Sequence, residues 1–220
     1  LGFDTRERLE RFVASLNEVV ARHDILRTAV LWEGLSKPVQ VVNRQAHVVL
    51  EWPEIDNAAH VRAQLENLID PTRHRIDVRR APMIRLLAAQ DAANDRWLLQ
   101  LASHHLISDH TTLERMVHEI GLLQQGRSSE LPPVVPFRNF VAQAVLGADE
   151  AAHEAFFTDM LGDIEETTAP FGLLDVQGDG STVEEIRHPL PADLSASIRQ
   201  VARAQGVSAA SVFHLAWALV

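Results

Sequence analysis

Histidine, serine and aspartate side chains gather in one short stretch of the sequence, SHHLISDH over residues 103–110. Near neutral pH an imidazole can accept or donate a proton, and a nearby carboxylate can hold a loop or orient the ring. Successive residues at the end of a strand point to opposite faces, so His104 and His105 cannot both face the same cleft. We therefore expect one histidine to work in a site while the other packs in the loop.

Two predicted elements enclose this stretch. Residues 83–89 and 97–102 have the apolar composition of a strand pair, joined by a polar turn over residues 91–95. After the histidines a helical pattern continues as far as Gly126, a residue typical of helix ends. A loop anchored by a strand and a helix is a good position for a functional site. The expected apolar stripe of this helix consists of Leu113, Met116, Val117, Ile120 and Leu123.

Other helices and strands are predicted around this loop. Residues 5–22 repeat apolar side chains at helical spacing. We expect the tryptophans at positions 32, 52, 97 and 217 in the core, because they lie in apolar segments. The expected buried face of the first helix consists of Leu9, Phe12, Leu16, Val19 and Val20. Residues 25–32, 39–42 and 48–50 are expected to form two or three antiparallel strands. The other predicted elements are helices over residues 58–69, 137–146 and 150–161.

A segment rich in glycine, over residues 167–182, divides the predicted structure. Residues 1–166 form a first lobe, in which hairpin-like strand pairs among helices predict an α/β sandwich with a mixed, mostly antiparallel sheet flanked by helices. Residues 183–220 are expected to be the truncated beginning of a second lobe, because the last helix ends with an uncovered apolar face. The elements predicted there are a strand over 183–190, a helix over 193–205 and a helix that begins after Ser208.

Composition narrows the function. The 220 residues are 46% hydrophobic and 23% charged, as in an ordinary globular domain. No cysteine is present, which excludes disulfides, thiol nucleophiles and cysteine-ligated metals. A net charge of −10 disfavours nucleic acid or an anionic membrane as a partner. No apolar run approaches the ~20 residues of a membrane span, so we expect a cytoplasmic protein.

Four motifs, in order along the chain, carry a family resemblance. RHDILRT over residues 22–28 matches RHxxLRT, and HHLISD over residues 104–109 matches HHxxxDG apart from its glycine. IDV with PMIR, within residues 76–85, is similar to FDLxxxPLxR, and PFRNF over residues 136–140 is similar to an aromatic motif that opens a helix. On these residues the chain resembles the condensation domains of non-ribosomal peptide synthetases, in the superfamily of chloramphenicol acetyltransferase. Residues 190–217 are similar to the beginning of that family's second lobe.

The resemblance implies a V-shaped domain of two acyltransferase-like lobes, of which this chain is a fragment that carries most of the first. It implies an acyltransferase that joins a donor aminoacyl or peptidyl thioester to the amine of an acceptor aminoacyl thioester. Both substrates would ride on phosphopantetheine arms of upstream and downstream peptidyl carrier protein domains, beside an adenylation domain, with no cofactor bound by the chain itself. The fragment alone is then expected to be inactive, because half of the tunnel between the lobes is missing.

The same resemblance implies roles for the residues of the motif. His105 would face the tunnel as the catalytic residue, acting as a base, as a positioning group or by stabilising the tetrahedral intermediate. Asp109 would be structural, buried behind the loop and paired with Arg27. We expect His104 to order the loop. His110 stands where the motif ends in glycine, and its side chain could point to solvent, narrow the tunnel or mark a diverged module.

Several alternatives remain open. Ser108 is a second candidate for lining the tunnel. A condensation-like module could have lost catalysis and dock a partner enzyme, for which His110 is the one hint. A stand-alone acyltransferase of the same superfamily would share the motif and use a carrier-bound or coenzyme A thioester. A metal site is also conceivable, but the spacing is not that of a zinc-binding helix, and we expect none. Its ligands would come from His104, His105, Asp109, His110 and His118.

Overall fold

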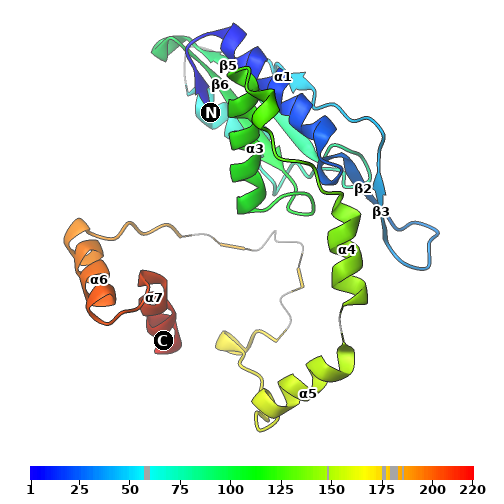
Figure 1. The fold of residues 1–220 in the computed structure, drawn as a ribbon. Helices are drawn as coiled ribbons and strands as arrows, with labels where there is room; N and C mark the ends of the chain where they lie inside the picture. The colour runs from blue at the N-terminus through cyan, green and yellow to red at the C-terminus, as the bar shows by residue number, and fades with distance from the viewer. Residues whose placement is uncertain (57–59, 148, 175–176, 179–182, 185) are drawn as a thin grey trace. The chain divides into compact units, whose positions relative to one another are not determined.

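A computed structural model describes residues 1–56, 60–147, 149–174, 177–178, 183–184 and 186–220. The described residues fall into two compact units, Leu1–Gly172 and Leu173–Val220. The first unit combines a sheet with helices (Figure 1). It contains residues 104–109, which connect a strand to a helix and are called the histidine loop below. Its α-helices are α1 (Arg6–Arg22), α2 (Val61–Leu68), α3 (His110–Gln124), α4 (Phe137–Leu146) and α5 (Glu150–Leu161), and those of the second unit are α6 (Ala192–Ala204) and α7 (Ala209–Ala218).

A four-stranded sheet forms the centre of the first unit. Its spatial order is β1 (Gly2–Phe3), β6 (Arg96–Ser103), β5 (Ile84–Asp91) and β4 (Leu50–Glu51). β6 pairs antiparallel with both β1 and β5, whereas β4 pairs parallel with β5. The antiparallel pairing predicted for residues 48–50 is therefore wrong. A parallel pair needs a long crossover connection, and the chain between β4 and β5 supplies one that contains α2.

The side chains of β5 alternate between two cores, which makes the unit a sandwich. Ile84, Leu86 and Ala88 belong to the core shared with α1 and α3. Leu87 and Ala89 belong to the second core, which they form with α2. Figure 1 shows α1 and α3 side by side over β5 and β6. The predicted α/β sandwich, with a mixed sheet flanked by helices, is confirmed.

Helix α1 buries the face that its sequence predicts. It begins after Thr5, whose Oγ1 accepts a hydrogen bond from the Arg8 N–H at 3.2 Å and so caps the helix. Phe12 is half-buried and packs against the core. The fully buried members of the predicted face are Leu9, Leu16, Val19 and Val20.

Helix α3 buries a face that differs from the predicted stripe. Met116 and Ile120 are buried as expected, but Val117 is 62% exposed. Glu119, which lay outside the stripe, is only 1% exposed. Several faces of this helix carry apolar residues, and the contact with α1 decides which one is buried.

A separate two-stranded ribbon consists of β2 (Thr28–Leu31) and β3 (Val39–Val42), which pair antiparallel as predicted. The strand predicted over residues 25–32 begins later than expected, because Ile25–Arg27 is a 3-10 turn. The Asp24 carboxylate accepts a hydrogen bond from the Ile25 N–H at 2.9 Å, which favours the turn over an extended chain. The other 3-10 turns described are Ala92–Asn94, Ser128–Glu130 and Pro170–Gly172.

The strand predicted over residues 183–190 is not present in the described residues 183–184 and 186–190. A strand needs a neighbouring strand for its backbone hydrogen bonds, and the elements described in the second unit are helices. Helices α4 to α7 begin and end within two residues of the predicted limits. Residues 58–59 of the predicted helix 58–69, and residues 175–176 and 179–182 of the predicted linker, lie outside the described residues.

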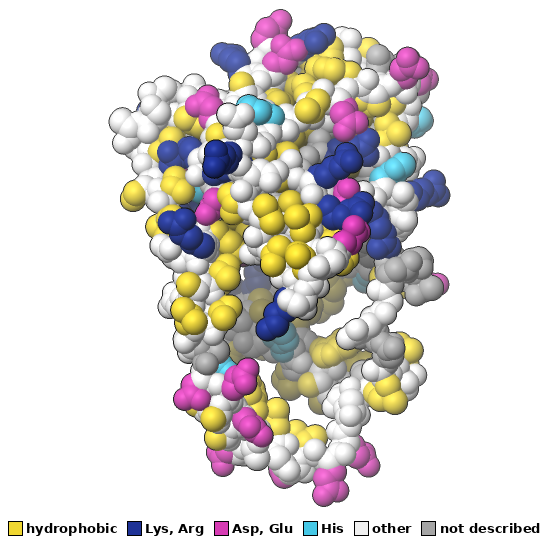
Figure 2. Space-filling view, turned by 90° about the vertical axis from the view of Figure 1, so that its right-hand side faces the viewer, with side chains coloured by type: hydrophobic (Ala, Val, Ile, Leu, Met, Phe, Trp, Pro, Cys, Tyr) yellow, Lys and Arg dark blue, Asp and Glu magenta, His cyan; other side chains and the backbone are white. Residues whose placement is uncertain are grey.

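Hydrophobic, basic and acidic side chains are intermixed on the face drawn in Figure 2. Of the tryptophans predicted in the core, Trp97 packs against it, whereas Trp32, Trp52 and Trp217 are exposed. The Arg6 guanidinium lies over the Trp52 ring, 4.6 Å from the ring centre. Within the described ranges, no helix has the length and apolarity that a membrane crossing requires.

Candidate active site

The histidine loop begins at a fixed point on the edge of the sheet. Ser103, the last residue of β6, pairs with Ile84 of β5. One residue further along, the His104 N–H donates a hydrogen bond to the Met83 carbonyl at 3.0 Å, which extends the pairing into the loop. The Ser103 and Ser108 hydroxyl oxygens lie 3.0 Å apart and close the loop on itself. The backbone at the two histidines is therefore held from both sides.

The two histidines differ in their surroundings. His104 is half-buried, and its Nδ1 accepts a hydrogen bond from the Leu106 N–H at 3.1 Å. His105 is exposed, and its ring hydrogen-bonds to none of the described residues. The His104 ring therefore takes part in the hydrogen bonding of the loop, whereas the role predicted for His105 stays a prediction.

His105 lies in the wall of a pocket of about 640 Å³. Part of its lining comes from the connector before α4, residues 132–137, and from α4 itself. Such a pocket can hold an apolar group beside an imidazole that carries out proton chemistry. The apolar lining consists of Ile25, Leu106, Ile107, Val135, Pro136, Phe137 and Phe140, and the polar lining of His105, Ser108, Asp109, Thr112 and Arg115.

Asp109 is the N-cap of α3. Its Oδ1 accepts hydrogen bonds from the Thr112 hydroxyl and from the Thr112 N–H, each at 2.7 Å. The hydroxyl first, and then the N–H, stabilise the carboxylate and hold the pKa of Asp109 below its usual value. His105 lowers this pKa further through its charge. The cap thus fixes the start of α3 directly after the loop.

The predicted ion pair between Asp109 and Arg27 is wrong. Asp109 is exposed and satisfied by the start of its own helix, so it needs no buried cation. Arg27 instead donates hydrogen bonds from Nη1 to the carbonyls of Asn43 and Arg44, the latter at 3.3 Å, directly after β3. Its buried Nε has no hydrogen-bond partner among the described residues. Arg27 therefore fastens the end of the β2–β3 ribbon and not the histidine loop.

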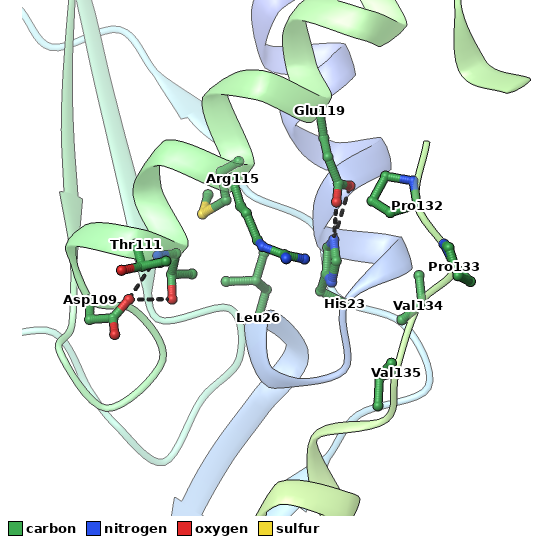
Figure 3. A pocket seen from close by; sticks show the side chains of 12 residues that line it. His23, Leu26, Asp109, Thr111, Arg115, Glu119, Pro132, Pro133, Val134 and Val135 are labelled. Atoms are coloured by element: carbon green, nitrogen blue, oxygen red, sulfur yellow. Dashed lines mark hydrogen bonds and ion pairs between the residues drawn. The ribbon is translucent and has the colours of Figure 1, made fainter. Parts of the chain in front are cut away.

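A second pocket, of about 280 Å³, adjoins the first, because Asp109, Thr112, Arg115 and Val135 line both. Figure 3 shows Glu119 reaching down from α3 toward His23, with Pro132 to Val135 passing beside this pair.

Glu119 holds a buried charge in this second pocket. Its two carboxylate oxygens lie 3.0 and 2.9 Å from Nε2 of His23, and one of them also accepts a hydrogen bond from the Arg22 Nε at 3.2 Å. Glu119 is not among the residues predicted from the sequence. An acidic residue one position before Ile120, on the buried side of α3, was the available signal, because a buried carboxylate requires partners.

Three more hydrogen-bond contacts hold the connector, residues 132–137. Arg22 donates from Nη2 to the Pro132 carbonyl at 2.8 Å. The Phe137 N–H, at the start of α4, donates to both carboxylate oxygens of Asp24, at 3.0 and 2.9 Å. Residues 22–24, identified from the sequence only as part of a motif, thus fix both ends of the connector.

His110 takes the first position of α3 and lies 3.2 Å from a Glu114 carboxylate oxygen, one turn further along the helix. Its side chain is 86% exposed, so in the described residues it points to solvent, which is one of the three alternatives given above. Within the described part of the chain, no group of three or more metal-ligating residues that could hold an ion is found.

Comparisons with known proteins cover the whole chain. The model of the family described as Condensation domain matches residues 2–220. Malpinin synthetase of Mortierella alpina is 45% identical over 220 residues, which make up 100% of this chain and 3% of that protein. Malpibaldin synthetase of the same organism is 43% identical over 220 residues, which make up 100% of this chain and 4% of that protein. The chain therefore spans a small part of these curated relatives.

Solved structures show the same fold. The first condensation domain of the calcium-dependent antibiotic synthetase superimposes with a TM-score of 0.70 at 18% identity, over 97% of this chain and 51% of that chain. A condensation domain associated with chain release from the enacyloxin polyketide synthase gives a TM-score of 0.62 at 19% identity, over 92% of this chain and 41% of that chain. The predicted chloramphenicol acetyltransferase-like fold is thereby confirmed.

Proposed function

This chain belongs to the condensation-domain family, and on that premise we propose that it is part of an enzyme that forms peptide bonds in non-ribosomal peptide synthesis. The amine nitrogen of an acceptor aminoacyl group attacks the carbonyl carbon of a donor thioester. A C–N bond forms, the C–S bond breaks, the donor arm leaves as its thiol, and the lengthened product stays on the acceptor arm. The observation that carries the proposal is the exposed His105 ring in the wall of an apolar pocket.

His105 acts on the attacking amine. An ammonium group has no free electron pair, so it must lose a proton before it can attack. The imidazole can take that proton, hold the amine in line with the carbonyl carbon, or stabilise the charge of the tetrahedral intermediate. A thioester is already an activated acyl donor, and positioning of the two reactants supplies much of the rate. The exposed ring of His105, on a loop fixed at both ends, supports each of these roles.

The neighbours of His105 act as structural support in this proposal. His104 orders the loop through its hydrogen bond with the Leu106 N–H, and the buried Ser108 closes the loop and lines the pocket. Asp109 fixes the start of α3. Arg27 supports the β2–β3 ribbon through the two carbonyls that follow β3.

The proposal extends to the whole enzyme. Residues 1–166 form most of a first lobe, residues 167–182 a linker, and residues 183–220 the beginning of a second lobe that completes a tunnel in a V-shaped domain. Upstream and downstream peptidyl carrier protein domains deliver the substrates on their phosphopantetheine arms, and an adenylation domain lies next to them in the same synthetase. Residues 1–220 alone are not expected to catalyse the reaction.

The test uses the intact two-lobed domain with both carrier domains, loaded with aminoacyl thioesters. Mass spectrometry of the downstream carrier should show a dipeptidyl product only when donor and acceptor are both loaded. No product from a folded, correctly loaded enzyme across several donors would reject the proposal and favour the non-catalytic docking module, to which the replacement of glycine by His110 points. A product formed equally well from a coenzyme A thioester would instead indicate a stand-alone acyltransferase.

A further inference from the structure

We propose that Arg22, Asp24 and Glu119 form a clamp that holds the connector over residues 132–137 and thereby positions the wall of the His105 pocket. Asp24 is the central member, and it is a positioning residue because it lines neither pocket. The catalytic consequence of the clamp rests on the proposed function, whereas its effect on the connector does not.

Helix α4 receives its cap from a distant segment of the chain. Pro136, which precedes α4, provides no side-chain cap. The Asp24 carboxylate, 113 residues earlier in the chain, accepts the Phe137 N–H with both oxygens, at 3.0 and 2.9 Å. A negative charge at the start of a helix also interacts favourably with the helix dipole. Asp24 therefore determines where α4 begins in space.

The connector is rich in proline. Proline has no backbone N–H, so Pro132, Pro133 and Pro136 cannot donate hydrogen bonds that would hold this segment. The hydrogen bonds described above therefore bind it at its two ends: Arg22 at the Pro132 carbonyl, at 2.8 Å, and Asp24 at the Phe137 N–H.

The residues of the clamp are themselves held by further hydrogen bonds. Glu119 is buried in α3 and accepts a hydrogen bond from the Arg22 Nε, which orients the guanidinium toward the connector. His23 lies between Arg22 and Asp24 in the sequence, and its Nε2 is 2.9 Å from a Glu119 carboxylate oxygen. Asp24 also accepts the Ile25 N–H, so its rotamer is fixed by the 3-10 turn. The connector is thus tied to α1 and α3, which form the core of the unit.

The segment that the clamp holds contributes to the His105 pocket. Val135, Phe137 and Phe140 line the same pocket as His105, and the rings of Phe137 and Phe140 lie 5.5 Å apart. When Asp24 is removed, the start of α4 and both rings lose their fixed distance from His105. Misplacement of bound reactants by about 1 Å can slow an enzymatic reaction by about 100-fold, so a shift of this wall should be visible in kcat.

The experiment compares variants of the intact domain with its carrier domains. Asp24→Ala removes the acceptor and Asp24→Asn keeps one acceptor oxygen. Arg22→Gln removes the hydrogen bond to Pro132 together with the ion pair to Glu119 and leaves Asp24 in place. Asp149→Ala is the matched control, because Asp149 accepts the Ala152 N–H at 3.1 Å and caps α5, a helix that contributes no residue to the lining of the His105 pocket. The two measurements are hydrogen–deuterium exchange of the amides in residues 134–140 and the steady-state kinetics of amide formation.

For Asp24→Ala we expect about tenfold faster exchange at Phe137, as for one lost hydrogen bond, and a kcat at least about tenfold lower with little change in KM for the carrier proteins. Asp24→Asn should restore most of both values, and Asp149→Ala should leave residues 134–140 unchanged. Parental exchange at Phe137 in folded Asp24→Ala would overturn the clamp, and so would parental kcat in that variant.

If Asp24→Ala does not fold, Arg22→Gln decides: faster exchange within residues 134–137 supports the clamp, and parental exchange overturns it. If the parent enzyme forms no product, the proposed function fails, but the exchange measurement still decides whether the clamp holds the connector. The two failures are therefore distinguishable.

Discussion

Replacing Glu119 by alanine should destabilise the domain far more than its position on an amphipathic helix would suggest. The carboxylate is 1% exposed and has Arg22 and His23 as partners, at 3.2 and 2.9 Å. Removal of one member of a fully buried ion pair costs about 3–5 kcal/mol, because the remaining charge is left without a partner. Here the partner side chains are 28% and 22% exposed, so water can solvate them in part. We therefore expect Glu119→Ala to lower the free energy of unfolding by about 2–3 kcal/mol.

Urea denaturation of the intact domain measures this loss, from the shift of the midpoint at constant slope. The matched control is Glu114→Ala on the same helix, whose exposed carboxylate is paired with His110 and should contribute within about 0.5 kcal/mol. Glu119→Gln, which keeps the shape and one acceptor, should fall between the two. A loss for Glu119→Ala no larger than that for Glu114→Ala would refute the assignment of Glu119 as a buried anchor.

Two further predictions concern stability. Asp109→Ala should give a folded protein that is less destabilised than Glu119→Ala, because Asp109 is an exposed cap. Since the pKa of Asp109 is lowered in the folded state, the loss of stability relative to the parent should be full above about pH 4 and should disappear as the pH falls through the lowered pKa. Urea midpoints across that pH range measure this difference. An insoluble variant would contradict this prediction. Leu16→Ala removes a fully buried side chain from the core and should cost about 2–5 kcal/mol in the same assay, whereas the half-exposed Leu35→Ala should change little; equal losses would contradict the described core.

Much of the fold could be predicted from local pattern. The apolar face of α1, the strand pair β5 and β6, and the limits of α4 and α5 follow from periodicity over many residues, where a single exception changes little. The direction of β4 could not be predicted in this way. Two residues of strand carry no information on whether the neighbouring strand runs parallel, and the crossover through α2 decides it.

Long-range partners were the weakest part of the prediction. The motif placed His104, His105, Ser108 and Asp109 in one loop, as the structure has them. It did not indicate that Asp109 is satisfied within its own helix, three residues along the chain.

The contacts of the clamp residues could not be predicted from the sequence either. The partners of Glu119 and Asp24 are 96 and 113 residues away, and spacing along the chain carries no signal for such contacts. Only their residue types, an acid on the buried face of a helix and an Arg-His-Asp sequence at a helix end, could have raised the question.

We propose that His105 carries out the chemistry of amide formation. The most direct measurement is the single-turnover rate of dipeptidyl product on the downstream carrier, by mass spectrometry, for His105→Ala against the parent and against His110→Ala as the control on the exposed side of α3. We predict that His105→Ala loses at least about 100-fold in rate with an unchanged urea midpoint, while His110→Ala stays within a fewfold of the parent. Parental rates from folded His105→Ala would show that His105 takes no part in the reaction.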